Sequence, residues 1–160
     1  MSANPRPDGG LWPHALALYA RPGVAPLCLE AQDTLGADVP LLLWAAWAAS
    51  RGYRLTNGDM TRAEALATAW RAPVIQPLRR ARRALKDMTS LGDAGAGTLY
   101  QAVKQAELEA ERQYMAALEH LAEDWPHPGR ANNDALRDNL ARLLPPTARA
   151  VTERLHKALS

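Results

Sequence analysis

The chain has no phenylalanine, a single cysteine and few β-branched aliphatic residues among its 160 residues. With so little Val and Ile, the sequence has few of the residues that favour β-strands. The lone Cys28 excludes an internal disulfide and a zinc site made of several cysteines, and it fits a reducing compartment. The longest uncharged apolar run, Val39 to Ala49, is about half of the ~20 residues that span a bilayer. We therefore expect a soluble α-helical protein in the cytoplasm, without membrane contact.

Length and composition indicate one globular domain. A chain of 160 residues is long enough to bury a single core, and an apolar share of 48% with a charged share of 22% is ordinary for globular proteins. The first ten residues are rich in Pro and Gly and have no apolar run, so we expect residues 1–10 to be a disordered lead-in. We expect residues 11–160 to form a single all-α domain.

Hydrophobic periodicity predicts a bundle of seven to eight helices. The segment at about 39–51 is apolar on every side, because its bulky residues cannot share one helical face: Leu41, Leu42, Leu43, Trp44 and Trp47. A helix that is hydrophobic all round is a buried helix, so we expect this one at the centre of the bundle. Asp38 is a suitable N-cap for it. Ser/Thr-x-x-Glu/Gln spacings predict further helix starts, at Thr61 and Thr98.

Charge changes sign sharply between two neighbouring segments. Residues 61–90 carry seven Lys/Arg and two Asp/Glu, whereas residues 91–125 carry two and seven. A glycine-rich connector near 93–95 lies between them, so we predict an antiparallel pair of helices at about 74–90 and 98–124. This register brings Arg82 near Glu107 and Arg79 or Leu78 near Glu111, with Arg79 pointing further toward water than Arg82. A break or kink of the helix is expected at Ala72, because Pro73 follows it.

Three cations of the first helix in this pair remain unmatched by that register: Arg80, Arg83 and Lys86. They are the candidate partner-binding residues, for an acidic protein partner or for nucleic acid. No aromatic residues interleave with them and no nucleic-acid motif is present, so nucleic-acid binding would be weak and salt-sensitive. The alternative is a solvated face that the neighbouring acidic helix partly neutralises.

A different interpretation places a small ligand beside the tryptophan-rich core. Arg71 and Gln76 are the candidate residues for orienting an anionic or apolar ligand there. Glu107 and Glu111 have a spacing seen in helical metal sites, but the Glu-x-x-His element of those sites is missing. The histidines are scattered and no phosphate loop or nucleophile motif is present. We therefore predict no metal, cofactor or catalytic residue, which favours a non-enzymatic protein without deciding the question.

Three runs are similar to a known family: Leu18-Tyr-Ala-Arg-Pro-Gly-Val24, Ala37-Asp-Val-Pro-Leu-Leu-Leu-Trp-Ala-Ala-Trp47 and Trp70-Arg-Ala-Pro-Val-Ile-Gln-Pro-Leu-Arg-Arg-Ala-Arg-Arg-Ala-Leu-Lys86. Over residues 11–125 the chain resembles a family of small bacterial cytoplasmic proteins of unknown function. The resemblance implies no activity, cofactor or site residue. The favoured interpretation is a non-enzymatic helical interaction module with a protein partner. A small-molecule-binding protein or enzyme is the alternative, and weak nucleic-acid binding is the third.

Overall fold

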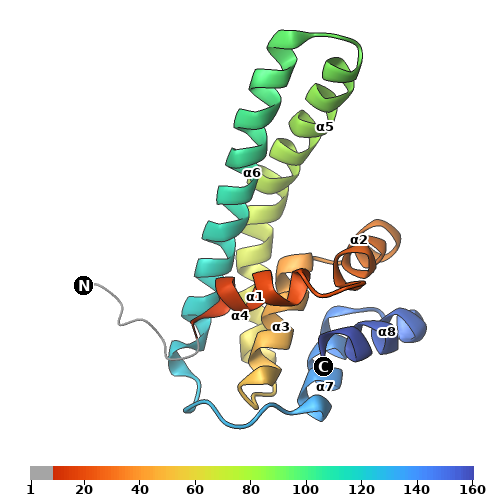
Figure 1. Ribbon diagram of the computed structural model, residues 1–160. Coiled ribbons are helices and arrows are strands. Elements are labelled where there is room, and N and C mark those ends of the chain that lie inside the picture. The colour runs from red at the N-terminus through yellow and green to blue at the C-terminus, as the bar shows by residue number, and fades with distance from the viewer. Residues whose placement is uncertain (1–8) are drawn as a thin grey trace.

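The computed structural model describes residues 9–160, and its regular structure is helical throughout this part of the chain. Residues 1–10 are the expected disordered lead-in, and residues 1–8 of that segment lie outside the described residues. The prediction of an all-α single-domain bundle is confirmed (Figure 1). The α-helices are α1 (Leu11–Tyr19), α2 (Val24–Leu35), α3 (Val39–Ser50), α4 (Asn57–Trp70), α5 (Gln76–Ser90), α6 (Ala94–His120), α7 (Asn133–Leu143) and α8 (Arg149–Leu159).

Helix α3 is the centre of the bundle, as its all-round apolar sequence predicts. Nine of its twelve residues are buried, in one unbroken run from Leu41 to Ala49. Asp38 caps its N-terminus by accepting a hydrogen bond from the Leu41 backbone N–H at 3.3 Å. Helices α1, α2, α6 and α7 all contact α3. A helix without a polar face requires this arrangement, because no side of it can be left in water.

Helices α5 and α6 form the predicted antiparallel hairpin, and its tip projects beyond the rest of the molecule (Figure 1). The expected start of α6 at Thr98 is wrong. The helix begins after Asp93, whose carboxylate accepts from the Ala96 backbone N–H at 3.0 Å. Gly92, at φ 91°, ends the turn that follows α5. An aspartate directly after such a glycine caps the helix before the chain reaches the threonine.

The outer part of the hairpin buries less than its apolar pattern predicts. Leu85 is buried, but Ala81 and Ala106 are exposed, and Met88 and Leu99 are 45% and 54% exposed. Two helices that stand away from the body bury only the seam between them, so the flanks of the expected stripe stay in water.

Helix α4 begins five residues before the predicted capping box at Thr61. The cap is Thr56, whose hydroxyl accepts from the Asp59 backbone N–H at 3.1 Å, while Asp59 accepts from the Thr56 N–H at 2.8 Å. At Ala72, where a break or kink is expected, the chain forms a π-helical turn, Arg71–Ile75, that joins α4 to α5 without a break. The wider turn lets the helix continue past Pro73, which has no N–H to donate.

The two ends of the chain are tied to the same core. Glu119 of α6 accepts from the Leu11 backbone N–H at 2.9 Å and so fixes the start of α1. Asn139 of α7 donates to the Ala45 and Tyr53 carbonyls and accepts from the Leu55 N–H. None of the described helices combines the length and the apolar character needed to cross a membrane.

Candidate functional site

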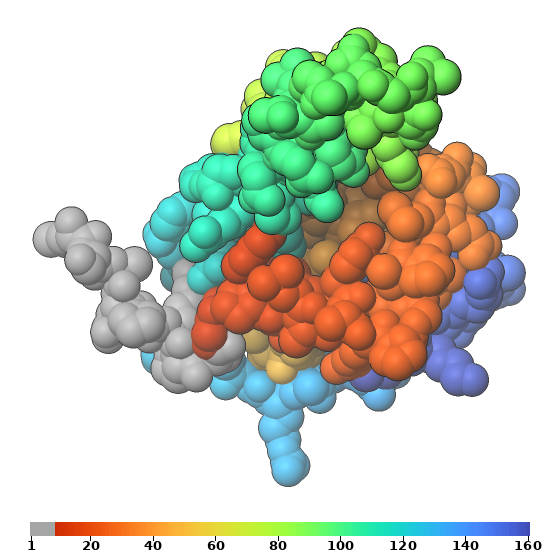
Figure 2. Space-filling model, turned by 45° about the horizontal axis from the view of Figure 1, so that its top comes forward, coloured from red at the N-terminus to blue at the C-terminus, as the bar shows by residue number. Residues whose placement is uncertain are grey.

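A cleft of about 300 Å³ lies between the α5–α6 hairpin and the helices α1, α2 and α3. Figure 2 shows it as a hollow between the hairpin, in green, and α1 and α2, in red and orange. Helix α1 packs on α3 and α6, and α2 packs on α3 and α8. The hairpin and the α1–α2 pair are therefore held on the same central helix, and the space between them stays open.

Apolar side chains form most of the cleft. Leu43 and Met115 are buried at 5% and 3% exposure, whereas the leucines on the outer side remain about half exposed: Leu16 at 52%, Leu29 at 46% and Leu108 at 46%. These three lie on α1, α2 and α6. They make up half of the six large exposed hydrophobic residues in the described chain. Exposed apolar side chains that gather beside polar ones mark interaction surfaces.

The hairpin side of the cleft is charged, and Arg79 is its centre. Its guanidinium donates to Glu107 Oε1, Glu111 Oε1 and Gln32 Oε1, each at 3.1 Å. Arg82 donates to the second oxygen of Glu107, so the predicted Arg82–Glu107 pair is confirmed. The expectation that Arg79 points further toward water is wrong. The two arginine side chains are 22% and 24% exposed, because Gln32 of α2 covers Arg79 from the far side of the cleft.

The two carboxylates on this wall differ in acidity. Burial alone would raise the pKa of Glu107, but hydrogen bonds from Arg82 and Arg79 outweigh it and hold that pKa below its ordinary value. The pKa of Glu111 is raised, because burial and the negative charge of Glu107 outweigh the opposite effect of the Arg79 guanidinium. Three arginines and two glutamates line the cleft, which leaves one positive charge on its wall.

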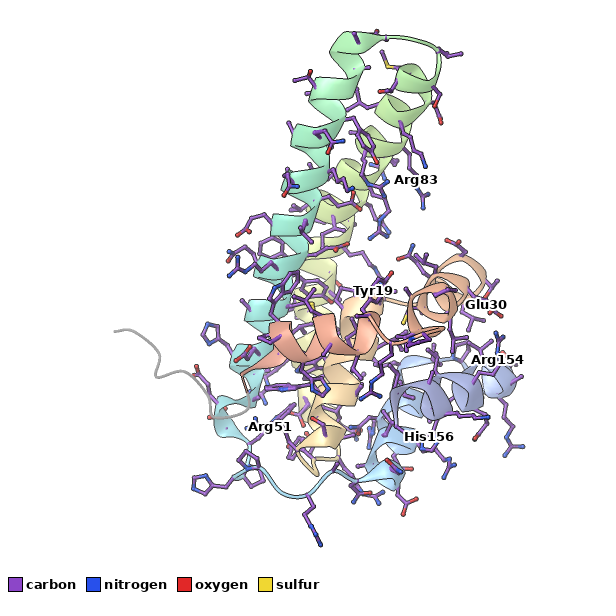
Figure 3. The ribbon with its side chains drawn as sticks, in the orientation of Figure 1. Tyr19, Glu30, Arg51, Arg83, Arg154 and His156 are labelled. Carbon is purple, nitrogen blue, oxygen red and sulfur yellow. The ribbon has the colours of Figure 1, made fainter. Side chains whose placement is uncertain are left out.

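That positive charge belongs to Arg83. Its side chain lines the cleft, lies on the α5 side that faces α2 (Figure 3), and makes no side-chain hydrogen bond or ion pair with any described residue. Lys86 follows on the next turn, exposed and likewise without a partner among residues 9–160. Arg80 is exposed but lies outside the cleft lining. Of the three predicted partner-binding residues, the structure thus places Arg83 in the cleft lining and both Lys86 and Arg80 outside it. By helical geometry Lys86 lies on the Arg79 side of Arg83, and Arg80 lies on the opposite side.

A smaller polar cavity of about 130 Å³ adjoins the cleft and shares Gln32, Arg79 and Glu111 with it. Arg71 and Gln76, the predicted ligand-orienting residues, both line this cavity. The structure does not bring them to the tryptophan-rich core, because Trp44 and Trp47 are 0% and 1% exposed and line neither space.

Asp38 is the central acceptor of the polar cavity. Its Oδ2 accepts from Arg71 at 3.4 Å and from the Tyr114 hydroxyl at 3.1 Å. Burial is the main cause that raises the pKa of Asp38, and burial also raises the pKa of Tyr114. The guanidinium of Arg71 is therefore already engaged within the protein.

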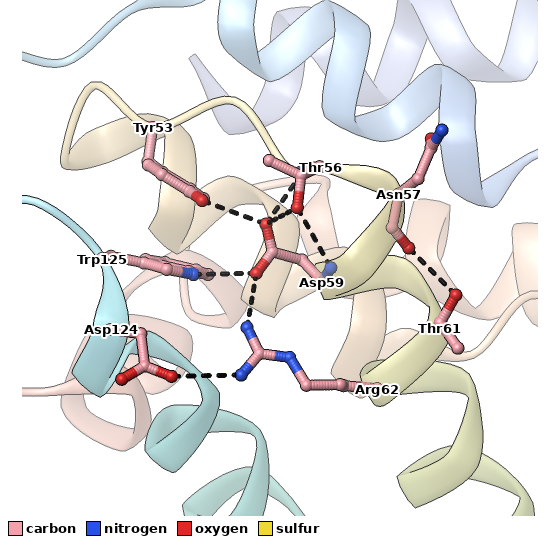
Figure 4. Close-up of polar contacts among 8 residues, drawn as sticks. All are labelled: Tyr53, Thr56, Asn57, Asp59, Thr61, Arg62, Asp124 and Trp125. Carbon is pink, nitrogen blue, oxygen red and sulfur yellow. Dashed lines mark hydrogen bonds and ion pairs between the residues drawn. The ribbon is translucent and has the colours of Figure 1, made fainter.

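A third buried carboxylate, Asp59, lies in the first turn of α4 (Figure 4). It is 1% exposed and accepts from Thr56, from the Tyr53 hydroxyl at 3.1 Å, from Trp125 Nε1 at 3.1 Å and from Arg62 at 3.0 Å. Trp125 also stacks on Tyr53 with ring centroids 4.3 Å apart. These donors come from the loop before α4, from α4 itself and from the segment after α6, so the centre joins the three, and none of its residues lines either cavity.

The walls of the cleft come from helices far apart in the chain, so the sequence does not predict the cleft directly. One signal was available. Leu29 lies off the buried stripe of α2, which contains Leu27, Cys28 and Ala31. Leu16 lies off the buried positions of α1 in the same way. Bulky leucines outside a core stripe on two neighbouring helices are the pattern that predicts a shared apolar surface.

Comparison with known proteins gives a single family. No match to this chain was found among the curated proteins or among the solved structures. A family model described as "Protein of unknown function (DUF2390)" matches residues 10–118. That span includes every residue that lines the cleft and the polar cavity, whereas α7 and α8 fall outside it. The match covers well over half of the chain, and the protein therefore belongs to this family of unknown function.

Proposed function

We propose that the protein is a non-enzymatic binding module and that the cleft beside the hairpin is its binding site. One observation carries the proposal. Leucines from α1, α2 and α6 remain half exposed around a single hollow, next to the unpaired Arg83. A protein that only needed a stable fold gains nothing from this arrangement, because it leaves apolar surface in water.

The chemistry of the lining supports binding rather than catalysis. None of the described residues that line the cleft is Ser, Thr, Cys or His. Glu107 accepts hydrogen bonds from two arginines, and Glu111 from one. A general base has to reach a substrate proton, and these carboxylates are directed at guanidinium groups of the protein itself.

The test uses an apolar anion, 1-anilinonaphthalene-8-sulfonate, whose fluorescence rises in apolar surroundings. We expect the wild-type protein to bind it, and Leu108→Glu to weaken binding by about 10-fold, which corresponds to ~1.4 kcal/mol. The matched control is Leu91→Glu at the hairpin tip, where the native side chain is 89% exposed and lies outside the cleft. Equal binding by Leu108→Glu and wild type, or loss of binding in the tip variant alone, rejects the proposal.

The cytoplasm is the location we propose. The single cysteine supports a reducing compartment. The resemblance of residues 11–125 to a family of bacterial cytoplasmic proteins supports the cytoplasm of a bacterium.

Nucleic-acid binding is a second candidate, favoured only by the exposed cations Arg80, Arg83 and Lys86. Three phosphate contacts give a shallow dependence of affinity on salt and weak binding. Filter binding of a 20-residue oligonucleotide at two salt concentrations tests this candidate. Tight, sequence-selective binding that persists at high salt would contradict the expected weakness.

A further inference from the structure

We propose that the cleft receives an acidic amphipathic helix from a partner protein. The apolar face of this helix packs on the three rim leucines, Leu16, Leu29 and Leu108, and its carboxylates pair with Arg83 and Lys86. This inference rests on the proposed function and adds the class of partner. It uses two features that the cavity alone does not explain: the apolar surface outside the hollow and the continuation of positive charge along α5.

The apolar surface at the rim favours a helix over a small ligand. Leu16, Leu29 and Leu108 lie on three different helices, and each keeps about half of its surface in water. A molecule that fills the hollow of about 300 Å³ leaves the outer faces of these leucines uncovered. A helix with side chains is about 10–12 Å wide, so it can insert apolar residues into the hollow and cover the rim at the same time. Helix-in-groove recognition buries apolar positions in this way.

The charges determine which helix fits. Arg79 and Arg82 are engaged by Glu107 and Glu111, so they offer little free charge to a partner. Arg83 and Lys86 have no partner among the described residues and are three positions apart on α5. They are therefore about 5 Å apart along the helix axis, on neighbouring turns. Carboxylates three or four positions apart on a partner helix match this spacing.

The charges of Arg83 and Lys86 disfavour other classes of partner. A basic helix would bring like charges onto Arg83 and Lys86, which disfavours binding and slows encounter. A nucleic acid would satisfy the two cations but leave Leu16 and Leu29 exposed, since phosphates do not cover apolar surface. An acidic amphipathic helix is the class of partner that uses both the leucines and the cations.

The experiment compares three fluorescent peptides of equal length with the full-length protein. One is an acidic amphipathic helix with Leu at i, i+3, i+4 and i+7 and Glu elsewhere. The second replaces Glu by Lys, and the third has the acidic composition scrambled so that no apolar face forms. Fluorescence anisotropy measures the affinities. We expect the acidic amphipathic peptide to bind at least about 10-fold more tightly than either of the others.

Substitutions in the cleft test which residues contact the peptide. The double change Arg83→Glu and Lys86→Glu should reverse the preference between the acidic and the basic peptide. Arg80→Glu makes the same type of charge change on the same helix outside the cleft, and it should keep the wild-type preference. Leu108→Glu should weaken peptide binding, as it weakens dye binding, by about 10-fold.

Three results overturn this inference. The first is equal or undetectable binding of the three peptides up to about 1 mM, where the binding free energy is only ~4 kcal/mol. The second is displacement of the dye by dodecanoate with one-to-one stoichiometry, without displacement by the acidic peptide, which makes the occupant a small amphiphile. The third is tighter binding of a single-stranded oligonucleotide than of the peptide. The dye experiment separates these results from failure of the proposed function, because a cleft that binds the dye and no acidic helix refutes only the helix.

Discussion

Two polar centres of this protein bury carboxylates beside arginines, yet their surroundings differ. Asp59 is 1% exposed and accepts hydrogen bonds from Thr56, Tyr53, Trp125 and Arg62, none of which lines either cavity. The Arg79 centre links α5, α6 and α2 but borders an open cleft. The pKa of Asp59 is lowered, because its hydrogen bonds outweigh the effect of burial, whereas burial raises the pKa of Glu111. A buried charge by itself therefore does not mark a binding site; adjoining space and unmatched groups do.

The largest expected effect comes from opening the closed centre. Asp59→Ala leaves the Trp125 indole N–H, the Tyr53 hydroxyl and the α4 cap without their acceptor. Breaking a buried charged network of this kind costs about 3–5 kcal/mol. Urea unfolding followed by tryptophan fluorescence measures it. Asp124→Ala is the control, because its side chain is 83% exposed and should cost less than about 0.5 kcal/mol. Equal losses in the two variants would show that Asp59 does not hold the core together.

The same change in the open centre should cost less. Glu107→Ala removes the acceptor of Arg79 and Arg82, whose side chains are 22% and 24% exposed and can be hydrated from the cleft. We expect a loss of about 1–3 kcal/mol in urea unfolding, the range for an unsatisfied buried polar group. A loss as large as that of Asp59→Ala would mean that both centres are structural.

Much of the fold could be predicted from residues close together in the chain. The all-round apolar sequence of α3 placed it at the centre, and the charge swing with its glycine connector gave the hairpin and the Arg82–Glu107 pair. Competing local sequence patterns explain the helix starts that were predicted wrongly. Thr56 and Thr61 both match a helix start, and the neighbouring Asn57-Gly58 favoured a loop where α4 begins. Local patterns also could not show that Trp125, far along the chain, closes the centre around Asp59.

The cleft could not be predicted, for a different physical reason. It is the space left when α1 and α2 pack against α3 at a distance from α5, and no short-range pattern describes unfilled space. Its cation was within reach, because Arg83 was among the residues left unmatched by the hairpin register. Leu16 and Leu29, off the buried stripes of their helices, indicated the apolar half only in part, and its closure by Leu108 of α6 required positions in three dimensions.

Acidity distinguishes the two centres further. The lowered pKa of Asp59 means that the folded state binds its proton less tightly than the unfolded state does. Its contribution to stability is therefore present above the ordinary carboxylate range and lost as the pH falls through that range toward the lowered pKa. Asp59→Asn cannot titrate, so its stability deficit relative to wild type should shrink by about 1–2 kcal/mol between about pH 6 and pH 3. Urea unfolding at both pH values measures the difference. A deficit that stays constant with pH would contradict the lowered pKa.

Glu111→Gln should have the smallest effect on stability and the most informative effect on binding. The raised pKa of Glu111 means that the folded protein holds this proton more tightly than the unfolded chain does, so the protonated carboxyl is the stabilising form. Its contribution is present below the ordinary carboxylate pKa and is lost as the pH rises through the raised pKa. At neutral pH the amide should change the free energy of unfolding by no more than about 0.5 kcal/mol.

Glu111→Gln removes one negative charge from the cleft wall and keeps an oxygen that can accept from Arg79. The acidic dye and the acidic peptide should therefore bind a few-fold more tightly, as expected when one partly exposed repulsive charge is removed. The gain should diminish as the pH falls, because wild-type Glu111 then takes up its own proton and becomes equivalent to the amide. The matched change in the closed centre, Asp59→Asn, should leave dye affinity unaltered where the protein is folded, since Asp59 lines neither cavity. If Glu111→Gln leaves both affinities unchanged, the acidic group of the ligand does not approach this wall, and the open centre serves the fold as the closed one does.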